Sequence, residues 1–116
     1  MAATSVIFIQ WQLPARGREK NAQETFGEAI ALYGRLQREG KIESFEPVLL
    51  DAHGDDLTGF ILVRGDPEKL DAVIHSGEYQ SLNMRAMYNV DGFGAVRGVI
   101  GEELARRMGF WQKNFL

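Results

Sequence analysis

Two histidines and one tyrosine are the residues of this chain most able to carry acid–base chemistry: His53, His75 and Tyr79. An imidazole titrates near neutral pH, which suits a general acid or base. His75 and Tyr79 are one helical turn apart across a break at Gly77, so both side chains could face one cleft over the sheet, where they could position or deprotonate a phenolic or enolic substrate. The alternative, which we favour, is a core tyrosine and a histidine at a helix C-terminus. All three remain the candidate catalytic residues.

His53 also belongs to a short acidic segment that contains Asp51, Asp55 and Asp56. Carboxylates and an imidazole are able to hold a divalent metal, but this spacing matches no metal signature known to us. Aspartate and glycine are favoured in turns by their local backbone bonding. We therefore interpret residues 52–56 as a solvated hairpin loop, predict no metal site, and retain His53 alone as a candidate base.

Two residues of the predicted strands, Trp11 and Arg97, are the candidates for substrate binding. A tryptophan provides a flat wall for a ring, and an arginine can hold an anion with two parallel hydrogen bonds. A tryptophan of a central strand is more often a core residue, and an arginine at a dimer interface more often pairs with a carboxylate such as Glu46 or Asp91. We favour these structural roles for both.

Composition excludes several classes of function. The chain has 116 residues, a net charge of -3 and no cysteines. We expect one domain over residues 1–116 and a cytoplasmic protein, without disulfides, thiolate metal sites or a cofactor. The acidic balance does not favour nucleic acid as a partner. The apolar run at residues 5–13 contains Gln10 and Gln12 and is too short to cross a membrane.

Strand and helix patterns alternate along the chain. Runs of apolar and β-branched residues predict strands at 5–13, 42–51, 57–64 and 90–100. A capping box at Asn21 and Glu24 predicts the start of a helix that ends at Gly40. Asp66 and Pro67 predict a second helix start.

The second helical region is predicted to be interrupted. Gly77 should break it, so that residues 78–88 form a separate helical piece. The strand at 90–100 carries glycines at 92, 94 and 98 on one face, where another backbone or a ligand can come close. A last helix has an apolar stripe and is expected to be docked: Leu104, Met108, Trp111 and Phe115.

The order strand, helix, strand, strand, helix, strand predicts an α+β fold. Two such split units give a ferredoxin-like βαββαβ antiparallel sheet with strand order 4-1-3-2 and both crossover helices on one face. The strands are apolar on both faces, whereas two helices cover only one. The uncovered face therefore predicts a homodimer.

The chain resembles the dimeric α+β barrel superfamily, in which two ferredoxin-like subunits bring their open sheet faces together and a C-terminal segment crosses to the partner. Residues 75–82, after the cap at Asp66 and Pro67, are similar to the antibiotic-biosynthesis-monooxygenase and stress-responsive barrel proteins. Residues 90–94, with the helix from Glu102, are similar to uncharacterised bacterial members. The superfamily includes cofactor-free monooxygenases, isomerases and haem proteins, and fold alone does not select among them.

The resemblance implies a homodimeric dimeric α/β barrel protein with a small pocket between sheet and helices. We expect a small aromatic or enolisable ligand and a cofactor-independent monooxygenase or isomerase reaction. The alternative is a non-catalytic module for dimerisation or ligand sensing. Convergent His, Tyr and Arg side chains in the pocket favour the first interpretation, and a cavity filled by Phe8, Phe60 and Phe93 favours the second.

Overall fold

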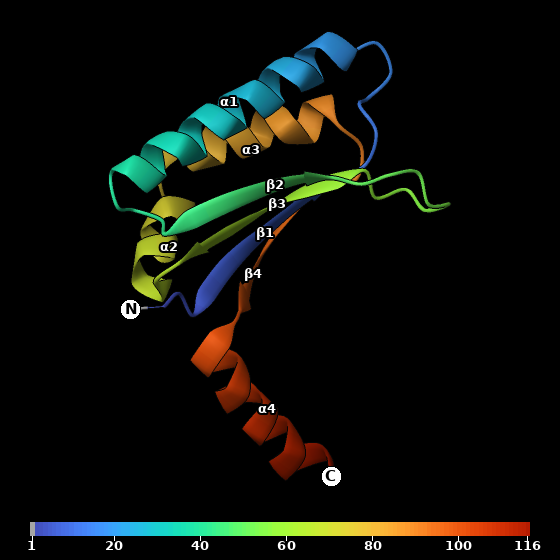
Figure 1. Cartoon of the computed structure of the whole chain (residues 1–116). Helices are drawn as coiled ribbons and strands as arrows, with labels where there is room; N and C mark the ends of the chain where they lie inside the picture. Colours follow the sequence, from blue (N-terminus) through green and yellow to red (C-terminus); the bar gives the residue numbers. More distant parts are fainter. Residues whose placement is uncertain (1) are drawn as a thin grey trace.

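A computed structural model describes residues 2–116 as a four-stranded sheet with helices packed on one face (Figure 1). The sheet order is β2-β3-β1-β4, and each neighbouring pair is antiparallel, which confirms the predicted order. The strands are β1 Ser5–Trp11, β2 Ser44–Leu49, β3 Gly59–Gly65 and β4 Gly94–Val99. The helices are α1 Glu19–Arg38, α2 Pro67–Ile74, α3 Gly77–Asn89 and α4 Gly101–Phe115.

Two capped helix starts fit the predicted positions. Asp66 caps α2 by accepting a hydrogen bond from the Lys69 amide at 3.2 Å, and Pro67 is the first helical residue, where no amide donor is required. Ser76 caps α3, because its Oγ accepts a hydrogen bond from the Tyr79 amide. The predicted interruption at Gly77 is confirmed, because α2 ends before it and α3 begins there.

The predicted start of the first helix was wrong. α1 begins at Glu19, and its N-cap is Arg18, which makes no side-chain cap. The chain turns at Gly17, where φ is 78°, and the Gly17 amide donates to Glu19 Oε2 at 3.1 Å. The Arg18 guanidinium is held by Asn89 Oδ1 at 3.0 Å. These contacts place the helix start two residues before the expected capping box at Asn21.

The fourth strand is shorter than the predicted 90–100 because the chain turns before it. Gly92 has a φ of 62°, and a Cβ at that position would overlap the Gln12 side chain. Val90 pairs only with Pro14 in an isolated bridge. Gly94 and Gly98 lie on one face of β4, but Gly92 precedes the strand, so the expected three-glycine face contains two.

The core lies between the sheet and α1, α2 and α3. Strand residues Ile7, Ile61 and Val63 are at most 2% exposed, and they meet apolar side chains of the three helices. The helical members of this core are Tyr33, Leu36, Leu70, Val73 and Tyr79. Burial of these side chains supplies the main favourable term for folding this half of the molecule.

The opposite sheet face carries apolar side chains and no covering helix (Figure 1). The alternation of β1 and its register with its neighbours place Phe8, Leu62 and Val96 side by side on this face. Phe8 and Phe60 have ring centroids 5.2 Å apart, and Val96 is 61% exposed. The prediction that both faces are apolar is therefore confirmed. We call this surface the open face.

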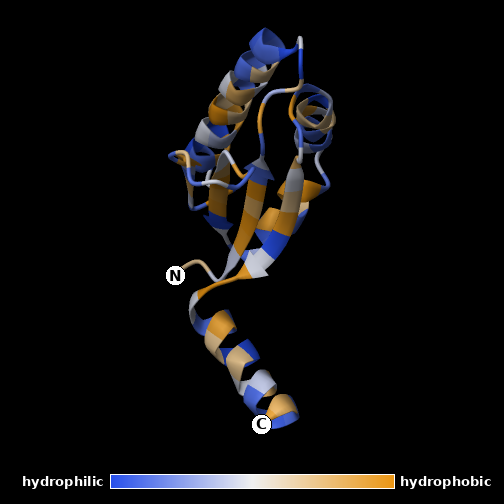
Figure 2. Cartoon of the chain, turned by 90° about the vertical axis from the view of Figure 1, so that its right-hand side faces the viewer, coloured by the Kyte–Doolittle hydropathy of each residue, from blue (hydrophilic) through white to orange (hydrophobic). Residues whose placement is uncertain are grey.

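α4 projects beyond the sheet and contributes no buried residue (Figures 1 and 2). Its apolar stripe is exposed, with Trp111 at 61% and Phe115 at 71%. The expected docking of this helix is not made against its own chain within residues 2–116. No helix of that described part has both the length and the hydrophobicity needed to span a bilayer.

Candidate functional site

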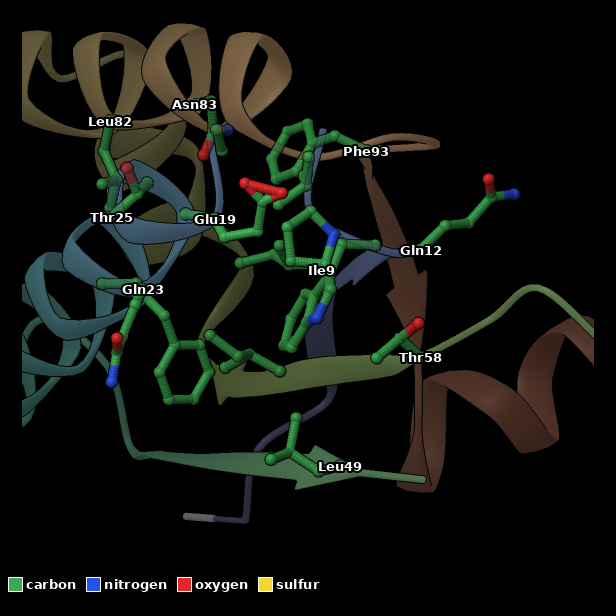
Figure 3. A pocket seen from close by; sticks show the side chains of 18 of the residues that line it. Ile9, Gln12, Glu19, Gln23, Thr25, Leu49, Thr58, Leu82, Asn83 and Phe93 are labelled. Carbon is green, nitrogen blue, oxygen red and sulfur yellow. The ribbon is translucent and has the colours of Figure 1, made fainter. Parts of the chain in front are cut away.

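An apolar cavity of about 380 Å³ lies between α1, α3 and the helix-covered face of the sheet (Figure 3). It occupies the end of the sheet at which β1 finishes, so strand-end and loop residues form its mouth. Leu49 and Thr58 line it from the β2–β3 side, and Leu82 and Ala86 line it from α3. The volume is suitable for a small organic molecule.

Four aromatic residues line the cavity: Trp11, Phe26, Tyr33 and Phe93. Trp11 and Phe26 meet edge to face, with centroids 5.7 Å apart and an interplanar angle of 65°. Gly59 makes room for the indole, because a Cβ there would lie 2.8 Å from Trp11 Cζ2 and 2.6 Å from the Val48 carbonyl oxygen. The cavity therefore depends on a glycine at position 59.

The polar side chains of the lining are few and differ in direction. In Figure 3 the Glu19 carboxylate lies on the side of Asn83 and Phe93, at the mouth of the cavity, where Glu19 is exposed, whereas the Gln12 and Gln23 side chains extend away. Glu19 Oε2 accepts the hydrogen bond from the Gly17 amide. Glu19 and Asn83 are thus the side chains best placed to contact a polar group of a ligand.

Tyr33 lies in the cavity wall and is 1% exposed. Its hydroxyl has no hydrogen-bond partner among residues 2–116. Burial raises the pKa of Tyr33 above its ordinary value of 10.0, and the neighbouring Tyr79 raises it further. The phenol is therefore neutral at physiological pH.

Tyr79 is buried behind the cavity wall and is joined to it by Asn83. Burial raises the pKa of Tyr79, while the hydrogen bond with Asn83 and the positive charge of Arg97 act in the opposite direction. Tyr79 does not itself line the cavity. The pair consequently connects a phenol of the core to an amide that a ligand can reach.

The two histidines lie away from the cavity lining and from each other. His53 is exposed in the loop between β2 and β3, with Nε2 at 3.0 Å from the Leu57 carbonyl oxygen. His75 is exposed at the C-terminus of α2, with Nδ1 at 2.7 Å from the Asp71 carbonyl oxygen. The acid–base roles proposed for these residues are still predictions.

The expectation that His75 and Tyr79 face one cleft was wrong. It applied the four-residue spacing of a helix across the predicted break, whereas His75 is the C-cap of α2 and Tyr79 belongs to α3. The Ser76 cap changes the direction of the chain between them, so the helical spacing does not apply across that point. His75 is consequently exposed and Tyr79 buried.

Arg97 pairs with a carboxylate, as favoured, but with a different one. It forms an ion pair with Asp71 and donates to Ser5 Oγ at 2.6 Å. Glu46 instead pairs with Arg64 at 3.3 Å. The reason is the side of the sheet: Arg97 is on the helix-covered face near α2, and Glu46 is on the open face. Arg97 does not line the cavity.

Within residues 2–116, no three His, Asp or Glu side chains converge in an arrangement suitable for a metal ion. The acidic loop is exposed, and Asp55 accepts a hydrogen bond from the Asp56 amide at 2.6 Å. This contact fits the predicted solvated turn.

Of the candidate site residues only Trp11 lines the cavity. Sequence reasoning named Phe93 as a possible cavity-filling side chain and missed Glu19 and Asn83. Glu19 was assigned to a polar connector because the helix start was set at Asn21. Gly17, followed two residues later by an acidic residue, is the signal that would have moved this start. Asn83 and Phe93 carry no local pattern that distinguishes a wall residue from a core or loop residue.

No family model matches the chain, and no curated protein matches it. Solved structures do match. A dimeric ferredoxin-like protein of unknown function from Jannaschia sp. CCS1 has a TM-score of 0.64 at 12% identity, covering 84% of this chain and 98% of its own. The hydroxynitrile lyase of Passiflora edulis has a TM-score of 0.67 at 9% identity, covering 88% and 97%.

SnoaB, a cofactor-independent oxygenase from Streptomyces nogalater, has a TM-score of 0.51 at 13% identity, covering 85% of this chain and 93% of its own. These structures confirm the ferredoxin-like α+β fold predicted from the sequence and the resemblance to dimeric proteins that share it. Their described activities differ, and at such identities the likeness concerns the fold alone.

Proposed function

We propose that the chain binds a small aromatic or enolisable molecule in the cavity between α1, α3 and the sheet. The observation that carries this proposal is a cavity of about 380 Å³ lined by four aromatic residues, with the polar side chains of Glu19 and Asn83 in the same lining. Phe93 is part of the wall, and Phe8 and Phe60 lie on the opposite face of the sheet, so the three phenylalanines do not fill the cavity.

The functional unit in this proposal is a homodimer joined through the open face. Apolar side chains of that face, including Phe8 on the central strand β1 and Val96 on the edge strand β4, would be removed from water by a second copy. The exposed stripe of α4 would contact the partner in the same assembly. Structural neighbours from three bacteria that are described as dimeric support this arrangement.

The reaction class we propose is cofactor-independent oxygenation or isomerisation. The first step would be proton transfer from a bound phenol or enol to the Glu19 carboxylate, the basic side chain of the lining, with Trp11 as the wall for the ring. Tyr79 would act through Asn83, and His53, His75 and Arg97 are retained as candidates from the sequence. The oxygenase SnoaB shares the fold, which supports this class without identifying a substrate.

A non-catalytic ligand sensor is the second candidate. It is favoured by the composition of the wall, because no histidine lines the cavity within the described residues. A sensor needs only to bind its ligand and change its conformation or assembly in response, whereas an enzyme must also convert a substrate into a product. Oxygen consumption with a panel of quinols separates the two, since sensing predicts binding without turnover.

Tryptophan fluorescence tests the binding proposal directly. The chain has two tryptophans, and W111F leaves Trp11 as the single reporter in the cavity. Hydroxynaphthalenes and quinols should change its emission with saturation. A29L should weaken binding by reducing the cavity volume, while A31L on the exposed side of the same helix should not. If A29L and A31L bind the probe with equal affinity, the assigned site is contradicted.

A further inference from the structure

The cavity lining carries charge of one sign. Glu19 is its sole charged side chain among the described residues, and lysine, arginine and histidine are absent from the same lining. The remaining polar contributors, such as Asn83 and Thr25, are neutral. An anionic ligand would face the Glu19 carboxylate without a compensating cation, whereas a cationic ligand would pair with it.

Nearby basic residues do not neutralise Glu19. No lysine or arginine nitrogen of residues 2–116 lies within salt-bridge distance of its carboxylate. The adjacent Arg18 donates to Asn89 Oδ1 and stacks 3.6 Å from the ring centroid of Tyr88. Glu19 is also the first residue of α1, where the helix dipole favours a negative charge. Its charge is therefore available to a ligand.

The aromatic walls add a second attraction for a cation. Trp11, Phe26 and Phe93 line the same cavity at whose mouth the exposed Glu19 carboxylate lies (Figure 3). A cation near an aromatic face is attracted by the ring quadrupole, most strongly by tryptophan. A carboxylate combined with aromatic walls is a chemistry that recognises an ammonium group attached to an apolar body.

We propose that the cavity selects small cationic amines with an aromatic body, held by Glu19 at the ammonium group and by the aromatic walls at the ring. This inference rests on the proposed function, because it names the ligand class of the same cavity. Neutral alcohols of the same shape bind more weakly, and the corresponding carboxylates are rejected. Glu19 is the specificity-determining residue.

Isothermal titration calorimetry with three matched probes tests this selection: 2-naphthylmethylammonium, 2-naphthalenemethanol and 2-naphthoate. At low salt the ammonium compound should bind about tenfold more tightly than the alcohol, and the carboxylate more weakly than both. E19Q should bring the ammonium and alcohol affinities together. E24Q removes the same charge from an exposed position of α1 outside the lining and should leave the preference intact.

The outcomes separate this inference from the proposed function. Saturable binding of the alcohol with no preference for the ammonium compound overturns the selection but leaves the cavity as a binding site. A preference that persists in E19Q overturns the role of Glu19. Failure of all three probes to bind, together with no Trp11 response in W111F, overturns both proposals.

Discussion

At the scale of single residues, two buried side-chain polar atoms among residues 2–116 have no hydrogen-bond partner: the Tyr33 hydroxyl and Arg97 Nε. The Tyr33 hydroxyl is buried in the cavity wall. A buried hydroxyl with no partner loses its bonds to water and gains none in return. The position is retained despite this cost, and the ring packs 6.0 Å from Phe45 across the helix–sheet interface. The packing of its ring explains an aromatic residue at position 33, whereas the hydroxyl makes no hydrogen bond within the described residues that would require tyrosine.

Y33F should change how stability depends on alkaline pH. Burial raises the pKa of Tyr33 above 10.0, so its neutral form is favoured in the folded protein, and its contribution is fully present below the unfolded value. As the pH rises above 10, the unfolded chain ionises first and the free energy of unfolding falls, by up to about 1.4 kcal/mol per pH unit for this group. Y33F has no ionisable hydroxyl at position 33, so its free energy of unfolding should fall less as the pH rises above 10.

Urea unfolding at about pH 8 and about pH 11 measures the difference. At the lower pH, Y33F should be as stable as the natural chain or more stable by about 1 kcal/mol, because an unpaired buried hydroxyl is removed. Y88F is the control, since Tyr88 is 66% exposed. Parallel pH profiles for the natural chain and Y33F would show that Tyr33 ionises as freely in the folded protein as in the unfolded chain.

At the scale of elements, the cavity exists because a glycine of β3 faces an indole of β1. Gly59 pairs with Trp11 across the strands and with Leu49 on the other side. Any side chain at this position would displace either the indole or the β2 backbone. The site is therefore built by the register of the sheet as much as by the helices above it.

G59A should destabilise the protein by about 2 kcal/mol, because its methyl group would enter contacts already closer than carbon atoms tolerate. It should also shift the emission of Trp11 in the W111F background. G77A is the matched control: a Cβ there meets no atom within 4 Å, and alanine favours the helix that begins at this residue. Thermal unfolding of both variants provides the comparison, and equal losses would contradict the assigned crowding.

The arrangement of elements followed from local patterns, whereas the site did not. Asp66 and Pro67 fix the start of α2 through bonds within a few residues, so their spacing in the sequence was sufficient. The start of α1 depends on Arg18 reaching Asn89, a residue of α3. The cavity likewise assembles Trp11, Asn83 and Phe93 from distant segments. Contacts between residues far apart in the sequence follow no periodic pattern, so they could not be predicted from a single sequence.

At the scale of the whole molecule, two apolar surfaces have no cover within the described chain: the open face and the stripe of α4. Large contiguous apolar patches are rare on the surface of soluble monomers. The two surfaces lie on a sheet and on a helix that extends beyond it (Figure 1). A second copy of the chain would cover both surfaces, because its sheet would pack on the open face and it would also contact the apolar stripe of α4. A single additional helix or strand would not cover both.

V96E tests the homodimer, because a carboxylate at position 96 should destabilise a dimer but not a monomer. Val96 is 61% exposed on the open face, at the middle of the edge strand β4, so a glutamate there costs a monomer little. In a dimer the carboxylate would be buried against the partner without a cation, at a cost of several kcal/mol. M84E places the same charge on α3, where Met84 is 70% exposed outside the open face. Sedimentation equilibrium at micromolar concentration should give the natural chain and M84E about twice the monomer mass of 13.0 kDa, and V96E the monomer mass. A V96E protein that stays dimeric and folded by circular dichroism would place the interface elsewhere, and a monomeric natural chain would contradict the assembly itself.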